Sequence, residues 1–371
     1  MSPLDPSPLD AALAGGLGLL GIAAVILAIP ATGKLCLDAL GVRMDSRALA
    51  LGFAVTLGFC LAMLVLYAPL ALTGRVVFWP AAALLGAGLA YAPFAVWRWR
   101  RSAAHPVDRA AIAGAVVLFA LLASLAHRAP FWGYDAKGIY GLKAKILLYE
   151  RDLAGPAFQD VDVVHYHADY PLGLPLVMAF SAWVAEGNPS DPRGHEPAAD
   201  ALEWVERHDA VNAYGTVAAL WVLGILAVLY HLARARFGSG RGAFLALFVG
   251  MPIALAFPWL AGRSWSWEGA DVPMALCLGV AGIAALRALD GLRLGPGTKQ
   301  ALIERPGRLL GVALIAAAGA LTLKFDAVIG LTSLGFVLLF GARPRVSARP
   351  LAALALGAAS ATLLVTIVTG T

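Results

Sequence analysis

The sequence predicts an all-α fold, a polytopic transmembrane helical bundle of about ten spans. Of its 371 residues, 60% are hydrophobic and 14% are charged, whereas soluble domains are about 45–50% apolar and about 25% charged. The mean hydropathy is +0.77, and apolar runs of about 20 residues, long enough to cross the hydrocarbon core as a helix, recur along the chain. This composition excludes a soluble globular enzyme, a disordered chain and an ordinary nucleic-acid-binding protein.

The first apolar run is predicted to be a retained transmembrane helix. Residues 1–10 before it contain no Lys or Arg, and a secretory signal needs a basic stretch there. Further runs of similar length follow to the end of the chain. The predicted spans are residues 12–31, 48–72, 76–97, 110–127, 210–233, 242–260, 272–289, 308–323, 326–342 and 350–371.

Residues 171–186 are apolar as well, but they are shorter than a span needs. If they do not cross the membrane, 18 of the 28 Lys and Arg residues fall on one face, in the short connections to which the positive-inside rule applies. If they did cross, every later connection would change sides. We therefore expect residues 171–186 to form a helix that lies along the outer surface.

This topology separates the charges of the chain by face. Both termini lie outside, and the formal net charge of +5 divides into +13 on the inner face and −8 on the outer face. Cys36, Cys60 and Cys277 lie within apolar runs, without the spacing of a metal site or a disulfide framework. We interpret them as small buried apolar side chains.

The outer segment 128–208 contains the first candidate site. Asp135 follows two aromatic residues and begins a helical pattern over residues 136–150. The apolar side of that helix could rest on the bilayer or on the bundle, while Lys137 and Lys145 could meet an anionic lipid headgroup. As alternatives, Asp135 is a helix cap and the lysines extend to the membrane surface without binding anything.

A second cluster precedes residues 171–186. His165, His167 and Asp169 lie within five residues of one another, and their side chains are suited to binding a metal ion. The alternative is a polar loop without a ligand.

The later outer connections are short and charged. Glu268 and Asp271 lie at the predicted start of span seven, and Lys324 and Asp326 lie between the eighth and ninth spans. A carboxylate can act as a general base, and a lysine can stabilise phosphate charge. The alternatives are a helix cap for the first pair and an ion pair at a span end for the second.

Four segments, taken in order, resemble the GT-C superfamily of polytopic membrane glycosyltransferases. They are FWGYDAKGIYGLKAKILLYE, HADYPLGLPLVMAF, GADVPMALCLGVAGIAAL and ALTLKFDAVIGL. The resemblance is to the bacterial branch related to protein O-mannosyltransferases and the lipid A aminoarabinose transferase, and it covers residues 128–340. That branch has W-D-A-x-x-x-W/Y-x-x-K-A-K-like, H-P-D-Y-P-L-like, A-D-x-P-x-A and T-K-x-E-G-like stretches. Here HADYP lacks the first proline, and LKFDA has Asp326 in place of Glu and lacks the glycine.

The resemblance implies a division at residue 109. Three N-terminal spans occupy residues 1–109, and residues 110–371 form a GT-C-like module whose catalytic loop is the segment 128–208. In the family this loop contains juxtamembrane helices, in agreement with the surface helices expected over 136–150 and 171–186.

The resemblance also implies roles for individual residues. Asp135 matches the loop acid that is the candidate general base of the family, and Asp271 matches an acid that helps to position substrate. The phosphate of the donor would be held by a subset of Lys137, Lys143, Lys145, Arg263 and Lys324. The other residues of the implied substrate site are His165, His167, Asp169, Tyr170, Glu268 and Asp326.

The implied function is an inverting transfer of a sugar from a polyprenyl-phosphate donor to a cell-envelope glycan, lipid or protein. The enzyme would be a multi-pass protein of the bacterial inner membrane with its active face on the periplasmic side, in contact with membrane lipids and not with nucleic acid. No fixed cofactor or metal ligand is implied, since some branches of the superfamily use a divalent cation and others do not. The alternatives are a transporter or flippase of a lipid-linked or anionic substrate and a non-catalytic assembly partner.

Overall fold

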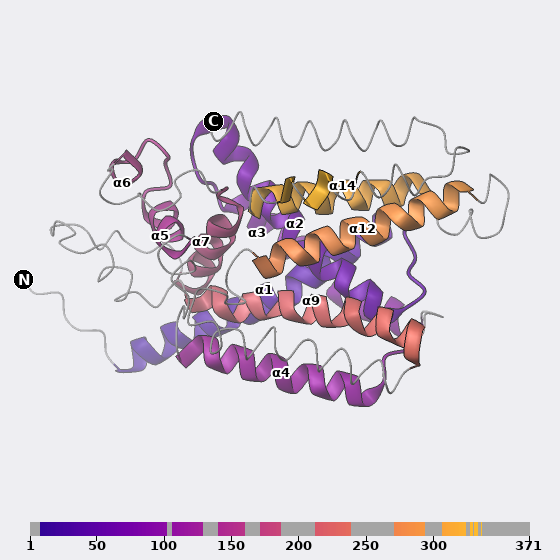
Figure 1. Cartoon of the computed structure of the whole chain (residues 1–371). Coiled ribbons are helices and arrows are strands. Elements are labelled where there is room, and N and C mark those ends of the chain that lie inside the picture. Colours follow the sequence, from indigo (N-terminus) through magenta and orange to yellow (C-terminus); the bar gives the residue numbers. More distant parts are fainter. Residues whose placement is uncertain are drawn as a thin grey trace, which may run out of the picture.

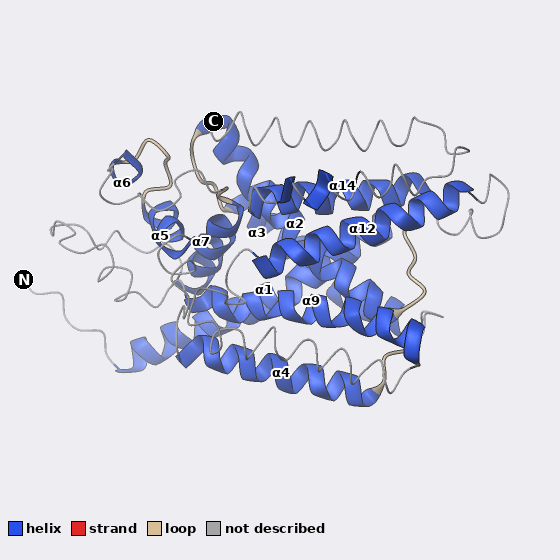
Figure 2. Cartoon of the chain, viewed as in Figure 1, coloured by secondary structure: helices blue, strands red, loops and turns tan. Residues whose placement is uncertain are grey.

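The computed structural model describes residues 8–101, 106–128, 140–159, 171–186, 212–238, 271–293, 306–323 and six positions between 327 and 335. This part of the chain is helical and contains no β-strand (Figure 2). Six of its helices are long and apolar enough to cross a membrane. The predicted class, an all-helical membrane protein, is therefore confirmed, while the number of ten spans stays a prediction.

The long helices coincide with predicted spans. Seven predicted spans match described helices, and the predicted spans 242–260 and 350–371 lie outside the described residues. The helices are α1 (Pro8–Ala39), α2 (Arg47–Thr73), α3 (Trp79–Arg101), α4 (Arg109–Arg128), α9 (Asn212–Phe237), α12 (Asp271–Arg293) and α14 (Pro306–Leu323). Three shorter helices lie between α4 and α9, namely α5 (Leu142–Tyr149), α6 (Pro156–Gln159) and α7 (Gly173–Glu186).

Local signals set both ends of α2, the most buried of the candidate spans. The hydroxyl of Ser46 accepts a hydrogen bond from the backbone N–H of Leu49 at 3.4 Å, which satisfies a donor that the first helical turn leaves free. At the other end Gly74 has a φ of 73°, a left-handed conformation that glycine adopts without a steric penalty. Its N–H donates to the carbonyl of Leu70 at 2.8 Å, and the helix ends there.

Glycines let α1, α2 and α3 pack so closely that their backbones are in contact. A methyl group at Gly33 would overlap the carbonyl of Ala54 on α2, and one at Gly58 would overlap the carbonyl of Ile29 on α1. Gly88 makes the same kind of approach from α3 to α1. Small residues at such crossings give close van der Waals packing, which drives helix association where lipid removes the hydrophobic effect.

Polar pairs join the connections at one end of the bundle. The guanidinium of Arg287 contacts both carboxylate oxygens of Asp45, at 3.0 and 3.1 Å. Burial raises the pKa of the Asp45 carboxyl, but Arg287, with smaller contributions from His231 and a backbone hydrogen bond, holds the pKa below its usual value. These pairs place the connections that the charge pattern assigns to one face at one end of the bundle. The pairs at this end are Arg287–Asp45, Arg308–Leu40, Arg234–Pro106 and Tyr230–Asp108.

At the other end of the bundle, opposite the Arg287–Asp45 pair, α2 and α14 end at different levels. The thiols of Cys60 on α2 and Cys277 on α12 are 3.6 Å apart, and the hydroxyl of Thr322 on α14 lies 3.8 Å from the sulfur of Met63 on α2. Since α14 ends at Leu323 and α2 continues for ten residues after Met63, α2 extends about 15 Å beyond α14 at 1.5 Å per residue.

Helix α7 occupies this level, and it runs across α9 and α12 rather than alongside them (Figure 1). Its orientation agrees with the prediction that residues 171–186 do not span the membrane. The helix is not exposed on a surface, however, because residues 173–182 are all buried, and its place at the outer face of the membrane stays a prediction. The backbone carbonyls of Val184 and Ala185 face Gly21 and Gly18 of α1. The apolar sequence of α7 therefore reflects packing inside the bundle.

Replacing Gly58 with alanine tests the close crossing of α1 and α2. The added methyl group overlaps the Ile29 carbonyl, so we expect Gly58→Ala to lower the free energy of unfolding by about 1–3 kcal/mol. Gly279→Ala is the matched control because no atom lies within 4 Å of a methyl group at that position. Denaturant titration of both variants in the same detergent measures the difference. Equal stability of the two variants would contradict this crossing.

Candidate functional site

Helix α5 is enclosed by the protein, although two of its eight residues are lysines. All residues from Tyr140 to Leu148 are buried, and the exposed fractions of Lys143 and Lys145 are 3% and 1%. Of the two predicted positions for its apolar stripe, the bilayer or the bundle, the structure shows the bundle, while the predicted position of its lysines at the lipid headgroups is wrong. α5 packs against α7 inside the fold, so its lysines are interior groups.

Burying the charged ammonium groups of Lys143 and Lys145 carries a free-energy cost. Removing such a charge from water costs several kcal/mol unless other groups compensate it. Both Lys143 and Lys145 interact with other groups of the protein, as this cost requires. Their positions, two residues apart, point the side chains about 200° apart around the helix axis. The two lysines therefore act on different sides of α5.

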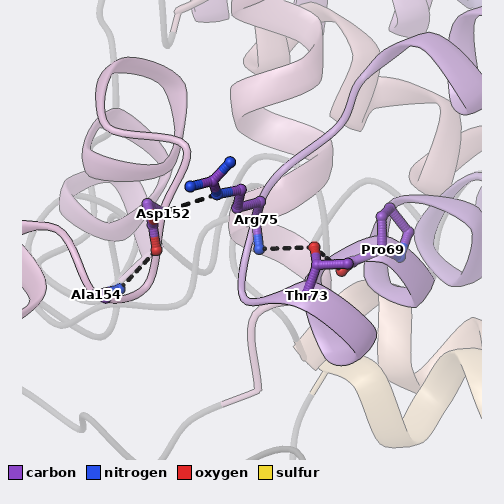
Figure 3. Close-up of polar contacts among 5 residues, drawn as sticks. All are labelled: Pro69, Thr73, Arg75, Asp152 and Ala154. Atoms are coloured by element: carbon purple, nitrogen blue, oxygen red, sulfur yellow. Dashed lines mark hydrogen bonds and ion pairs between the residues drawn. The ribbon is translucent and has the colours of Figure 1, made fainter.

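The chain after α5 is held against the connection between α2 and α3. The N–H of Val76 donates to the carbonyl of Arg151 at 2.8 Å, and the N–H of Leu153 donates to that of Gly74 at 2.9 Å. An ion pair links the Arg75 Nε to an Asp152 carboxylate oxygen at 3.5 Å (Figure 3). The two segments form a short antiparallel clamp, defined here as residues 74–76 with residues 151–153.

Local hydrogen bonds shape both sides of this clamp. The Thr73 hydroxyl donates to the carbonyl of Pro69 at 2.8 Å and accepts from the N–H of Arg75 at 3.2 Å (Figure 3). On the other side the Asp152 carboxylate accepts from the N–H of Ala154 at 2.9 Å, the usual arrangement of an aspartate at a turn. Arg151 itself has a φ of 55°, an uncommon conformation for a residue other than glycine.

An aromatic cluster joins the clamp to α7. The Arg151 guanidinium lies 5.3 Å from the ring centre of Phe78, within the range of a cation–π contact. The Phe78 ring lies 5.5 Å from Trp183 and 6.1 Å from Phe180, both on α7. Trp79 completes the cluster at 5.1 Å from Trp183. The loop after α5, the start of α3 and one face of α7 are thereby tied together.

The structure brings together the flanks of two sequence segments that are far apart in the chain. A methyl group at Gly173, the first residue of α7, would overlap the carbonyl of Thr322 near the end of α14. Gly173 follows the HADYP segment by two residues, and Thr322 precedes Lys324 by two residues. The packing of Gly330 against Leu278 of α12 places the chain on both sides of residues 324–326 next to α12.

Asp271 is placed at the same end. It is the first residue of α12, as predicted, and α12 packs along α14. The end of α14 packs against the start of α7, and the start of α12 lies at the same end of the bundle in Figure 1. Four features therefore converge there: the buried lysines of α5, the start of α7, the start of α12 and the end of α14.

Most of the other predicted site residues lie outside the described part of the chain. The side chain of Asp271 also lies outside it. Among the described residues no group of three His, Cys, Asp or Glu side chains is arranged to hold a metal ion. The predicted residues outside the described part are Asp135, Lys137, His165, His167, Asp169, Tyr170, Arg263, Glu268, Lys324 and Asp326.

The clamp is not predicted by the charge pattern of the sequence, in which Arg75, Arg151 and Asp152 count only as charges of the outer face. A turn signal was present in the sequence, because Asp152 is followed by Gly155 three residues later in the pattern of a reversing turn. The pairing of this turn with residue 75 had no signal in the sequence, since it depends on tertiary structure.

Comparison with protein-family models, with curated proteins and with solved structures finds no match for this chain.

Amine modification tests the burial of the α5 lysines. In the folded protein we expect Lys143 and Lys145 to be acetylated at least about tenfold more slowly than a lysine at an exposed position, because a reagent reaches them only after local opening. Arg43→Lys supplies the exposed position, in the connection between α1 and α2. Mass spectrometry of peptides measures all three sites, and unfolded protein shows that all three react. Equal rates in the folded protein would contradict the burial.

Proposed function

We propose that the protein is a GT-C-like glycosyltransferase that uses a polyprenyl-phosphate sugar donor at the end of the bundle formed by α5, α7, α12 and α14. The observation that carries this proposal is the burial of Lys143 and Lys145 on a helix that packs against α7, whose first residue meets the end of α14. A cationic group at the end of a membrane-spanning bundle suits a phosphate that remains attached to a lipid in the bilayer.

The order of the segments supports the same proposal. The HADYP and LKFDA segments lead into α7 and out of α14, which meet at Gly173 and Thr322. Asp271 begins the neighbouring helix α12. Segments that resemble donor-site motifs therefore have their flanks at one end of the bundle.

The proposed reaction is a single displacement with inversion. Asp135 accepts the proton of the acceptor hydroxyl, and that oxygen forms a bond to the anomeric carbon. The bond between this carbon and the phosphate oxygen breaks, and the polyprenyl phosphate leaves with the electron pair. A subset of the five cations is proposed to stabilise the phosphate charge, and Lys145 is the member of α5 that the first experiment tests, because the two lysines of α5 act on different sides of that helix. The five cations are Lys137, Lys143, Lys145, Arg263 and Lys324. The preorganised cations would act without further ordering during the reaction.

Binding of a polyprenyl phosphate tests the role of the lysines. We expect decaprenyl phosphate to bind the protein in nanodiscs, and Lys145→Met to weaken binding roughly tenfold, because a hydrogen bond to a charged group contributes about 1.5–3 kcal/mol. Lys145→Arg keeps the charge and should retain more of the affinity than Lys145→Met. Decaprenol, which lacks the phosphate, should bind both variants equally. Arg43→Gln, at the opposite end, is the control variant. Unchanged affinity in Lys145→Met would overturn the role of this lysine.

A second variant separates chemistry from binding. Asp135→Asn should bind decaprenyl phosphate as the unmodified chain does, since the change removes the base and leaves the cations. Radiolabelled sugar transferred to endogenous envelope acceptors in membranes that contain the protein should fall to background, because general-base catalysis contributes 10²–10⁴-fold or more. Retained transfer would show that Asp135 is not the base.

The proposed orientation has its own test. In a chain whose native Cys36, Cys60 and Cys277 are replaced by alanine, single cysteines are introduced at Val77, between α2 and α3, and at Arg43, between α1 and α2. Both positions are exposed. A membrane-impermeant maleimide added to intact cells should label Val77→Cys and leave Arg43→Cys unlabelled until the cells are lysed. The opposite result would place the α5–α7 end on the cytoplasmic side.

A further inference from the structure

A row of aromatic and basic side chains covers one face of the end of α3. The Phe94 ring lies 5.3 Å from the Tyr91 ring and 5.3 Å from the Trp97 ring. Phe94 and Trp97 are each 47% exposed, on a helix that has little of its surface buried. Residues three and four positions apart share one face of a helix. We call Tyr91, Phe94, Trp97, Arg98 and Arg101 the aromatic–arginine ladder.

The rings hold the guanidinium groups in place. The Arg101 guanidinium lies 4.5 Å from the Trp97 ring centre, and that of Arg98 lies 5.8 Å from the Phe94 ring centre. A guanidinium that stacks on a ring keeps its N–H donors in its own plane, where they can bind an anion. Such stacking also reduces the side-chain entropy that binding would otherwise cost.

The charge of the ladder is strongly positive. Within the described part of the chain its contacts include one carboxylate, Asp38, which pairs with Lys34 at 2.5 Å and Arg98 at 3.5 Å and accepts from Tyr91 at 2.5 Å. Arg101 forms no ion pair with any residue that the structure describes. The ladder therefore has unbalanced positive charge at the end of a candidate span.

We propose that the ladder is a binding site for one anionic phospholipid. Its phosphate lies between Arg98 and Arg101, which are neighbours on the helix surface. One acyl chain extends along Phe94 and Trp97 toward the middle of the bilayer. Charge complementarity selects an anionic headgroup, and the exposed rings of a membrane-spanning helix are covered by lipid.

The exposed face of α4 shows what an ordinary lipid contact of this protein contains. Its large exposed side chains are aliphatic, among them Ile112, Val116 and Val117. Its first residue, Arg109, is exposed at the same end of the bundle. The ladder differs from this face because its stacked rings, Phe94 and Trp97, contact the guanidinium groups of two arginines. Arg109 therefore provides a matched basic position outside the ladder.

Native mass spectrometry in a neutral detergent tests the site with two probes of equal acyl chains, phosphatidylglycerol and phosphatidylcholine. We expect one tightly held phosphatidylglycerol, and Arg101→Gln to weaken it about fivefold, the effect of one arginine near an anionic headgroup. Trp97→Leu should also weaken binding, because the arginine loses its ring. Arg109→Gln should leave the affinity unchanged, and the thermal unfolding of each variant confirms its fold.

Three results would overturn the proposal. The first is equal affinity of Arg101→Gln and the unmodified chain for phosphatidylglycerol. The second is equal affinity of the unmodified chain for phosphatidylcholine. The third is a dimer that Trp97→Leu abolishes, which would mean that a second copy of the chain covers the ladder instead of a lipid.

Discussion

The register of α2 against α12 and α14 sets the arrangement of the rest of the structure. Contacts of Cys60 with Cys277 and of Met63 with Thr322 fix this register, and Gly319 of α14 lies directly against Cys60. α14 therefore ends well below the end of α2. The end of a helix has backbone carbonyls without partners in the helix, and such groups cannot face hydrocarbon. Another part of the chain has to occupy this level, and α7 does so.

The placement of α7 determines that of α5 and its lysines. α7 extends from Thr322 on α14 to Gly18 and Gly21 on α1, and α5 packs on it. The clamp between residues 74–76 and 151–153 and the aromatic cluster fix the chain that follows α5. The lysines are thus enclosed by protein, where a charge is costly unless other groups compensate it. The packing of α5 and α7 that encloses the lysines therefore also forms the proposed donor site.

Much of the architecture follows from the sequence, because the length of apolar runs and the distribution of charges depend on the membrane alone. The long helices, the grouping of basic connections at one end and the start of α12 at Asp271 could all be predicted this way. The burial of Lys143 and Lys145 could not, since the sequence of α5 has the same pattern whether it rests on lipid or on α7. The level of α7 depends on the register of Met63 with Thr322, residues 259 positions apart, which no local pattern contains. Arg151 adopts its left-handed conformation for a similar reason, because the clamp imposes it.

The most direct test of the central claim is a cryo-electron microscopy map of the protein in a lipid nanodisc. The claim is that α7 fills the level between the ends of α14 and α2 and thereby encloses the α5 lysines. We expect density for α7 between Thr322 and Gly21, with Lys143 and Lys145 enclosed by protein beside it and away from the nanodisc lipid. A map that shows α7 on the lipid surface, with these lysines exposed to headgroups or solvent, would contradict both the packing described above and the donor site built on it.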